Sequence, residues 1–410
     1  MSTLTLTQKS AASYLTPVRR KKRIESIDFM RGAVMIIMAL DHTRHFFHQD
    51  AFVYEPTDLS HTTIFLFFTR FITHYCAPVF VFLAGMSAFL SGVKKSKREL
   101  AFYLISRGLW LIFVELVIIT LGQTFNPGLP YFNLQVIWAI GVSMIILAGL
   151  IFLKRLWILA IALLLIEGHN LLDNFHVIGT GPNAFIWSVL HEPNKFVWGN
   201  KTVFVMYPVL PWIGIMALGY CMGTLYHSRF DPEKRKKLLL YIGSAAIILF
   251  FILRAFNIYG DPVNWSVQRN AAFSFLSILN VTKYPPSLLY TLITLGPAMV
   301  LLALLDGHPL NSFTRRIAVF GRVPFFYYII HIYLLHLCAM VGAIISDYNW
   351  YDMILTTKLN LTPALKGYGF NLFSTYCIWI GLILFLYPFC KWFDHYKRNN
   401  QSTQWWLTYL

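Results

Sequence analysis

The chain has 410 residues, of which 57% are hydrophobic and only 13% are charged. A soluble domain carries about 25% charged residues, so this composition excludes an ordinary soluble protein and predicts a polytopic membrane protein. The net charge of +16 does not indicate a nucleic-acid-binding protein, because the Lys and Arg residues lie in short loops between apolar segments.

Residues 1–18 are polar and rich in Ser and Thr, which predicts a disordered cytoplasmic tail. A transmembrane domain is expected over residues 19–397, and a second cytoplasmic tail over residues 398–410. A helix needs roughly 20 residues to cross a bilayer, and by this rule we expect an all-α bundle of about ten spanning helices. Their predicted ranges are 27–47, 62–92, 98–122, 133–152, 155–173, 206–227, 235–257, 285–305, 315–344 and 370–393.

Lys and Arg residues are divided unevenly between the two sides of these predicted helices. Twenty-one fall in the terminal segments and loops of one side, against six in the loops of the other. Because the cation-rich side faces the cytoplasm, both termini are expected there. The long loops predicted outside, 174–205, 258–284 and 345–369, carry Trp and Tyr residues that suit the membrane interface better than stacking on a sugar.

The stretch Asp41-His42-Thr43-Arg44 is the most informative in the sequence. The apolar run before it, residues 33–40, is too short to cross a bilayer, so the first helix must carry these groups into the outer part of the membrane. Ionisable groups there usually face a bundle interior or a wet cavity and mark function. The alternative is a helix end that has already reached the lipid headgroups.

Other predicted helices carry ionisable residues at a similar depth. Arg70 and His74 are four residues apart and share a helix face, His331 lies on the ninth helix, and Lys283 precedes the eighth. We expect these side chains to line a shared polar cavity. For either histidine taken singly, a packed core histidine is an equally good explanation.

No known catalytic or metal-binding motif is present. The sequence has no H-E-x-x-H, P-loop or G-x-S-x-G pattern, and its five cysteines form no CxxC pair, so neither a metal site nor a disulfide frame is expected. Imidazole, carboxylate and guanidinium groups remain. These groups support general-base catalysis or acyl transfer through an imidazole, and they also support proton-coupled transport.

Several segments, in order along the chain, resemble the catalytic-domain family of heparan-α-glucosaminide N-acetyltransferase, most of all its bacterial branch. The resemblance runs over most of residues 23–393. It is carried by the segments SIDFMRG (26–32), MALDHTR (38–44), THYCAPVFVFLAG (73–85), YPVLPW (207–212), KYPP (283–286) and GRVPFF (321–326).

The resemblance implies a multi-pass enzyme in the bacterial inner membrane that passes acetyl from cytoplasmic acetyl-CoA to an amine or hydroxyl of a sugar outside. The large outward domain of the animal enzymes is missing before the first helix, so an envelope or imported glycan is the expected acceptor. The expected partners are acyl-CoA, the glycan, the lipid bilayer and a second copy in a homodimer. Acetyl-CoA is the donor, and no metal is expected.

Residue roles follow from this resemblance and from the polar pattern. His74 or His42 is expected to act as base or acyl relay, and Asp41 to polarise an imidazole on another helix. Arg31 and Arg322 are expected to bind the CoA phosphates on the cytoplasmic side. Acceptor binding is expected from Arg44, Arg70, Lys283 and His331.

Two other classes of protein remain open. A proton-coupled transporter of a sugar or lipid uses the same residue types, and a non-catalytic membrane receptor is a third reading. Acyl-CoA that copurifies with the protein favours the enzyme, whereas substrate accumulation in vesicles without acyl-CoA favours the transporter.

Overall fold

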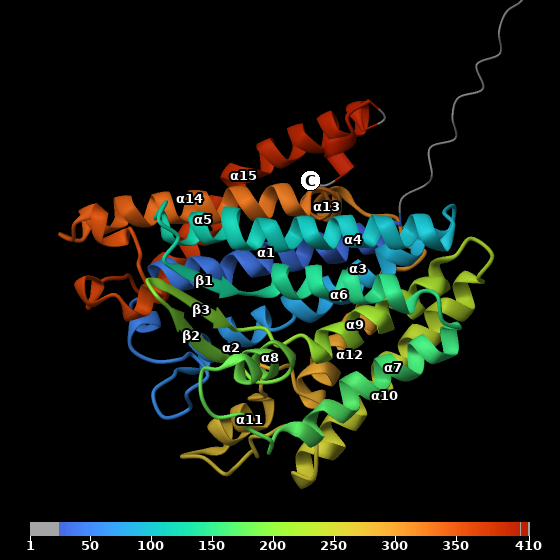
Figure 1. Ribbon diagram of the computed structural model, residues 1–410, viewed down its shortest axis with the longest axis horizontal. Coiled ribbons are helices and arrows are strands. Elements are labelled where there is room, and N and C mark those ends of the chain that lie inside the picture. The colour runs from blue at the N-terminus through green and yellow to red at the C-terminus, as the bar shows by residue number, and fades with distance from the viewer. Residues whose placement is uncertain (1–23, 402, 409–410) are drawn as a thin grey trace, which may run out of the picture.

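The computed structural model describes residues 24–401 and 403–408, so the tail expected over residues 1–18 lies outside the described residues. In the described part the chain is mostly helical, and α1 runs beside α13 and α14 in the bundle (Figure 1). The helices are α1 (Glu25–Phe47), α2 (Ile64–Thr73), α3 (Cys76–Gly92), α4 (Lys97–Phe113), α5 (Thr120–Thr124), α6 (Val136–Leu150), α7 (Arg155–Gly168), α8 (Pro182–Leu190), α9 (Leu210–Met222), α10 (Pro232–Phe256), α11 (Ala271–Leu279), α12 (Leu288–Leu305), α13 (Ser312–Arg322), α14 (Pro324–Ile345) and α15 (Leu372–Asn400).

Seven helices in the described part of the chain are long and apolar enough to cross a membrane. They begin with α2, which continues into α3, and α4, which continues through a π-helical segment (Val114–Ile119) into α5; the others are α7, α10, α12, α14 and α15. The expected count of about ten spans is therefore not confirmed. The helices α6 and α9 are apolar but shorter, and α1 has 23 residues but carries the charges of its polar stretch.

Two segments predicted as single helices are each interrupted. The segment 315–344 breaks at Val323 (φ −129°, ψ 49°), because Pro324 disfavours a helical conformation in the residue before it. In the segment 62–92 the backbone stays helical at His74 (φ −62°, ψ −28°), but the ladder of helical hydrogen bonds is interrupted there, four residues before Pro78. Since proline has no N–H, it leaves the His74 carbonyl free, and this carbonyl accepts a hydrogen bond from the Tyr290 hydroxyl at 2.7 Å.

Pairs of glycines bring helix backbones into contact at the main crossings. A Cβ added at Gly32 of α1 would overlap the carbonyl oxygen of Ile317 in α13, and one at Gly321 would overlap that of Asp28. The helices could not approach so closely with any larger residue, as is common where membrane helices pack. The same reciprocal arrangement joins α3 to α9 (Gly85, Gly219), α4 to α6 (Gly108, Gly141) and α10 to α12 (Gly243, Gly296).

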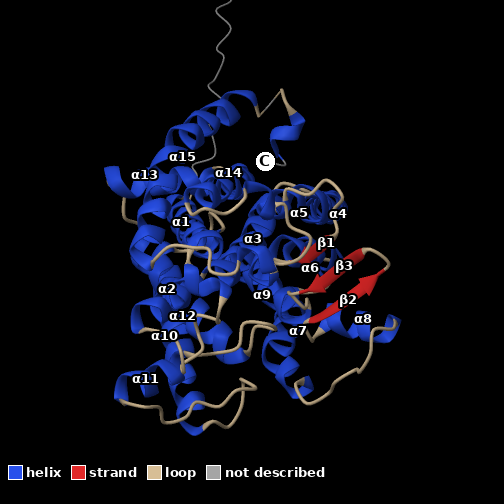
Figure 2. Cartoon of the chain, turned by 90° about the vertical axis from the view of Figure 1, so that its left-hand side faces the viewer, coloured by secondary structure: helices blue, strands red, loops and turns tan. Residues whose placement is uncertain are grey.

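A small sheet, absent from the sequence prediction, lies at the edge of the bundle beside α6 and α8 (Figure 2). Its strands are β1 (Tyr131–Leu134), β2 (Asn194–Trp198) and β3 (Lys201–Val205), in the order β1-β3-β2, with β3 parallel to β1 and antiparallel to β2. The buried side chains of Leu134, Phe196 and Val205 pack beneath it. Outside the spanning helices, pairing between the strands satisfies backbone groups that a helix would satisfy internally.

Contacts between distant segments define one end of the bundle, which we call the inner end. The Arg322 Nε atom lies 2.8 Å from an Asp394 carboxylate oxygen, so the start of α14 meets the last turns of α15. The start of α1 lies at the same end, because Asp28 packs against Gly321. The first and last long helices therefore have their terminal sides at one end of the bundle.

Substitution of Gly85 by Ala is expected to destabilise the bundle, because the added methyl would overlap the Met216 backbone oxygen. Overpacking of this kind costs roughly 1–3 kcal/mol. Thermal unfolding of the detergent-solubilised protein measures the loss. Gly149→Ala is the matched control, since nothing lies within 4 Å of a Cβ there, and its melting temperature should not fall. Equal melting temperatures for the two variants would contradict the packing argument.

Candidate functional site

A cavity of about 210 Å³ lies at the last turns of α1 and α2; the end of α1 that it occupies, opposite the inner end, is called the outer end. The segment before α12 and residues 355–360 of the loop between α14 and α15 close around it. Pockets for drug-sized molecules measure roughly 300–1,000 Å³, so this cavity suits a smaller group such as a single sugar ring. The ionisable residues that line it include Asp41, His42, Arg44, Arg70, Lys283 and Lys358.

Asp41 is the centre of an ion cluster on the cavity wall. One carboxylate oxygen lies 2.6 Å from Nη1 of Arg70, and the other lies 3.1 Å from Nη2 of Arg44, one helical turn further along α1. Both oxygens are thus engaged by guanidiniums, whereas the sequence had suggested an imidazole as the partner of Asp41. The cluster ties α1 to α2 and satisfies charges that would be costly to bury alone.

Further cations face the same cavity and exceed its carboxylates. Lys283 is only 8% exposed, and its ammonium lies 5.2 Å from the ring centroid of Tyr284, whose hydroxyl is 3.5 Å from Nη2 of Arg70. Lys358 lies 3.8 Å from the ring centroid of Phe204, and burial lowers the pKa of its ammonium. This excess of positive charge suits a carbonyl oxygen that becomes negative, or an anionic group on a ligand.

His42 lines the cavity and contacts a second imidazole behind it. Its Nδ1 atom lies 2.7 Å from Nε2 of His331 on α14, and the two rings are nearly parallel, with centroids 5.0 Å apart. His331 is fully buried and does not line the cavity, although the sequence had suggested that it binds the acceptor. The structure therefore brings His42 and His331 together and leaves only His42 within reach of a ligand.

His74 lies outside the cavity. Its side chain is 4% exposed, packs against the Tyr290 ring with centroids 5.5 Å apart, and is absent from the cavity lining, whereas its neighbour Thr73 is present. Of the two histidines proposed from sequence as base or relay, His42 is the one that a molecule in the cavity can touch.

A second pocket lies at the inner end and holds the residues expected to bind CoA phosphates. Arg31 and Arg322 line it together with Lys94 and Lys95. Arg31 also donates hydrogen bonds to the Gly321 carbonyl (3.0 Å) and to Ser87 Oγ (3.1 Å), so its guanidinium is held in place. Four cations from three separate segments of the chain thus converge on one concave surface, as binding of phosphate groups requires.

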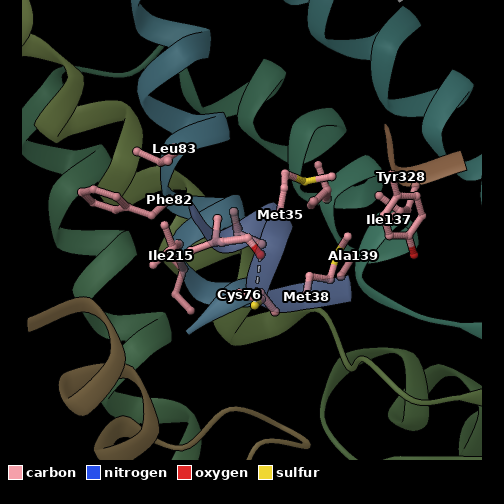
Figure 3. Close-up of a cluster of buried hydrophobic side chains, with 14 of the residues drawn as sticks. Met35, Met38, Cys76, Phe82, Leu83, Ile137, Ala139, Ile215 and Tyr328 are labelled. Carbon is pink, nitrogen blue, oxygen red and sulfur yellow. Dashed lines mark hydrogen bonds between the residues drawn. The ribbon is translucent and has the colours of Figure 1, made fainter. Parts of the chain in front are cut away.

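Packed apolar side chains separate the two pockets. Met38 lines the outer cavity and Arg31 the inner pocket, seven residues apart on α1, which is about 10 Å along the helix axis. Met35, Met38 and Cys76 belong to the buried cluster between them (Figure 3). The Cys76 thiol in this cluster contacts the Val34 carbonyl at 3.3 Å, and methionine side chains give such a layer adaptable packing.

Several residues of the cavity were not identified as site residues from the sequence. Tyr54, Glu55, Tyr284 and Lys358 line it. From the sequence, Lys358 entered only the count of cations that predicts the membrane orientation. The Tyr54 hydroxyl donates to Asp50 at 2.7 Å, and burial, together with this bond, raises its pKa to about 12. All four lie in connecting segments, where periodicity carries no information; only the KYPP segment around Tyr284 offered a signal.

Two other buried polar residues have structural roles. Glu115 accepts a hydrogen bond from the backbone N–H of Trp138 (3.2 Å) in the first turn of α6, whose own N-cap, Gln135, makes no side-chain cap bond. It therefore acts as a cap supplied by another helix. His336 contacts the carbonyls of Gly122 (2.9 Å) and Met353 (2.8 Å), which ties α14 to α5 and to the loop that follows α14.

The fold and the site define a class of protein: an integral membrane helix bundle with a polar pocket at each end of one charged central helix. The model of the family described as heparan-alpha-glucosaminide N-acetyltransferase, catalytic, matches residues 23–255, which is more than half of the chain. The chain belongs to this family, and the family implies a membrane acetyltransferase. A comparison with curated proteins finds no match. Among the described residues, no group of three or more His, Cys, Asp or Glu side chains is arranged to hold a metal ion.

Glu115→Ala is expected to lower stability by about 1 kcal/mol, the usual cost of losing a helix cap. Glu115→Gln should lose less, because an amide oxygen still accepts the Trp138 N–H. Thermal unfolding in detergent compares them. Glu167→Ala, at an exposed glutamate near the outer end of α7, is the control and should leave the melting temperature unchanged. If Glu115→Ala unfolds at the wild-type temperature, the capping role is wrong.

Proposed function

We propose that this protein passes an acetyl group from acetyl-CoA at the inner pocket to an amino or hydroxyl group of a sugar in the outer cavity. The observation that carries the proposal is the His42 imidazole on the cavity wall, beside the cations Arg70 and Lys283. Membership of an acetyltransferase family supports the same chemistry.

His42 acts as the general base in this proposal. It takes a proton from the acceptor nitrogen or oxygen as that atom attacks the thioester carbonyl. The carbon–sulfur bond then breaks, and CoA leaves as a thiolate that takes up a proton. Lys283 and Arg70 stabilise the negative charge that develops on the carbonyl oxygen, which is a major source of catalysis in such reactions.

The donor and acceptor sites lie on opposite parts of α1. Arg31 precedes His42 by eleven residues, which corresponds to about 16 Å along the helix. Because apolar side chains fill the space between the pockets, the acyl-bearing arm of CoA must insert between the helices for its thioester to reach His42. The phosphates would stay at the inner pocket, bound by Arg31, Arg322 and the neighbouring lysines.

The distribution of cations sets the orientation of the proposal. Lys and Arg are concentrated at the inner end, which we assign to the cytoplasm, so both termini are cytoplasmic and the acceptor lies outside. A glycan of the bacterial envelope, or an imported one, then meets the outer cavity while the donor stays inside. A proton-coupled transporter is not favoured, because the family is one of acetyltransferases.

Purified protein is expected to bind acetyl-CoA, and free CoA should compete with it. Arg322→Ala and Arg31→Ala should each weaken binding by about tenfold or more, since a charge-assisted hydrogen bond is worth roughly 1.5–3 kcal/mol. Calorimetry on folded protein measures the affinity for acetyl-CoA and the competition by free CoA. Lys237→Ala, at an exposed cation of α10 outside the pocket, should bind with wild-type affinity. An absence of binding by folded wild-type protein would count against acyl transfer.

His42→Ala is expected to lower acetyl transfer by about 10²–10⁴-fold, the usual contribution of a general base. His74→Gln should retain most of the activity, because His74 does not reach the cavity. The assay follows label from acetyl-CoA to glucosamine or to membrane glycans in vesicles, with matched amounts of each variant. Near-wild-type transfer by the His42→Ala protein would show that another group is the base.

A further inference from the structure

A backbone carbonyl, that of Tyr327, determines which histidine donates in the hydrogen bond between His42 and His331. The Nδ1 atom of His331 lies 2.9 Å from the Tyr327 carbonyl oxygen, one helical turn earlier on α14. A carbonyl oxygen only accepts hydrogen bonds, so this nitrogen carries the hydrogen. In a neutral imidazole the other nitrogen, Nε2, then has a lone pair and accepts.

The same reasoning extends to His42. Its Nδ1 atom lies 2.7 Å from Nε2 of His331, which accepts the hydrogen bond. Nδ1 of His42 must therefore donate, and it carries the hydrogen of the neutral His42 ring. The Nε2 atom of His42 is left unprotonated, with its lone pair available on the ring that lines the cavity. A backbone carbonyl at one end of the chain of bonds thus determines which nitrogen of His42 is basic.

The surroundings hold His331 in this role. Its ring stacks on that of Tyr327, with centroids 5.0 Å apart and planes 9° apart, and the ring of Tyr328 meets it edge-on at 5.5 Å. It is fully buried, so it cannot touch a molecule in the cavity. Both oxygens of Asp41 are bound by arginines, so the carboxylate nearest to His42 in sequence is not its partner.

We propose that His331 is a positioning residue: it fixes the tautomer and the ring orientation of His42 so that Nε2 is the atom that accepts the proton from the acceptor. The reaction it serves rests on the function proposed above. When Nε2 takes the proton, His42 becomes an imidazolium whose Nδ1–H still donates to His331. The proton leaves from Nε2 when the thiolate of CoA is protonated, which restores the original pair.

Nitrogen-15 NMR of histidine-labelled protein in bilayers tests the tautomer without any acceptor or donor. The His42 signals are identified by their loss in His42→Asn. In the wild type, Nδ1 of His42 should be protonated and Nε2 should not. In His331→Leu this preference should disappear, whereas His331→Gln, whose amide oxygen can accept the same bond, should keep it. His336→Gln is the matched control on α14 and should leave the His42 signals unchanged.

Transfer kinetics with acetyl-CoA and glucosamine supply the second measurement. His331→Leu should lower kcat roughly tenfold or more with little change in KM, and His331→Gln should recover a large part of the loss. A wild-type His42 protonated on Nε2, or a tautomer unchanged in folded His331→Leu protein, overturns the proposal. If the wild type shows the expected tautomer but transfers no acetyl group, the proposed function fails while the assignment of the pair stands.

Discussion

Close approach of helix backbones at glycine pairs is the constraint on which the rest of this structure depends. In a bilayer the lipid is as apolar as the side chains, so helices associate through packing and have little hydrophobic driving force. The contact between Gly32 and Gly321 sets the register of α1 against α13, and α14 follows directly. His42 and His331 each lie ten residues beyond these glycines and meet in the same register. Although α13 and α14 are separated by the break at Val323, His331 still lies level with His42. The glycine contact therefore aligns the two imidazoles.

The second constraint is charge. Arg44, Arg70 and Lys283 are each less than a tenth exposed, and Asp41 is the carboxylate that bridges the two arginines. Removing one partner of such a cluster leaves an uncompensated charge, which is far more costly than replacing the whole cluster. Lys283 makes no ion pair with a described residue, and a buried cation of this kind is a candidate for binding a ligand.

Of the site residues predicted from the sequence, five line the outer cavity, namely Asp41, His42, Arg44, Arg70 and Lys283, whereas His74 and His331 do not. A rise of 1.5 Å per residue predicts how far along their helices His42 and His74 lie. Which way each side chain points could not be predicted, because a helix in lipid is apolar on every face and shows no stripe that marks the core. The ion pair between Asp41 and Arg44 can be derived from their spacing of three residues. The contacts that Arg70 and His331 make with α1 cannot, because these two residues lie on other helices. Pro78 and Pro324 indicated the two helix interruptions. They were not used for this purpose because the apolar sequence continues through both positions. The strands lie between the spanning helices, and the rule that about 20 residues cross a bilayer predicts nothing about these segments.

The apolar layer around Met35 also has an electrical consequence. Polar pockets reach into the bundle from both ends, so the membrane potential falls mainly across the roughly 10 Å of packed side chains between them. One elementary charge moved through 100 mV corresponds to about 2.3 kcal/mol. An acetyl group is neutral and crosses this layer without electrical work, whereas a proton or a thiolate does not. Thioester chemistry in such a bundle can therefore join two compartments while the layer still insulates one from the other.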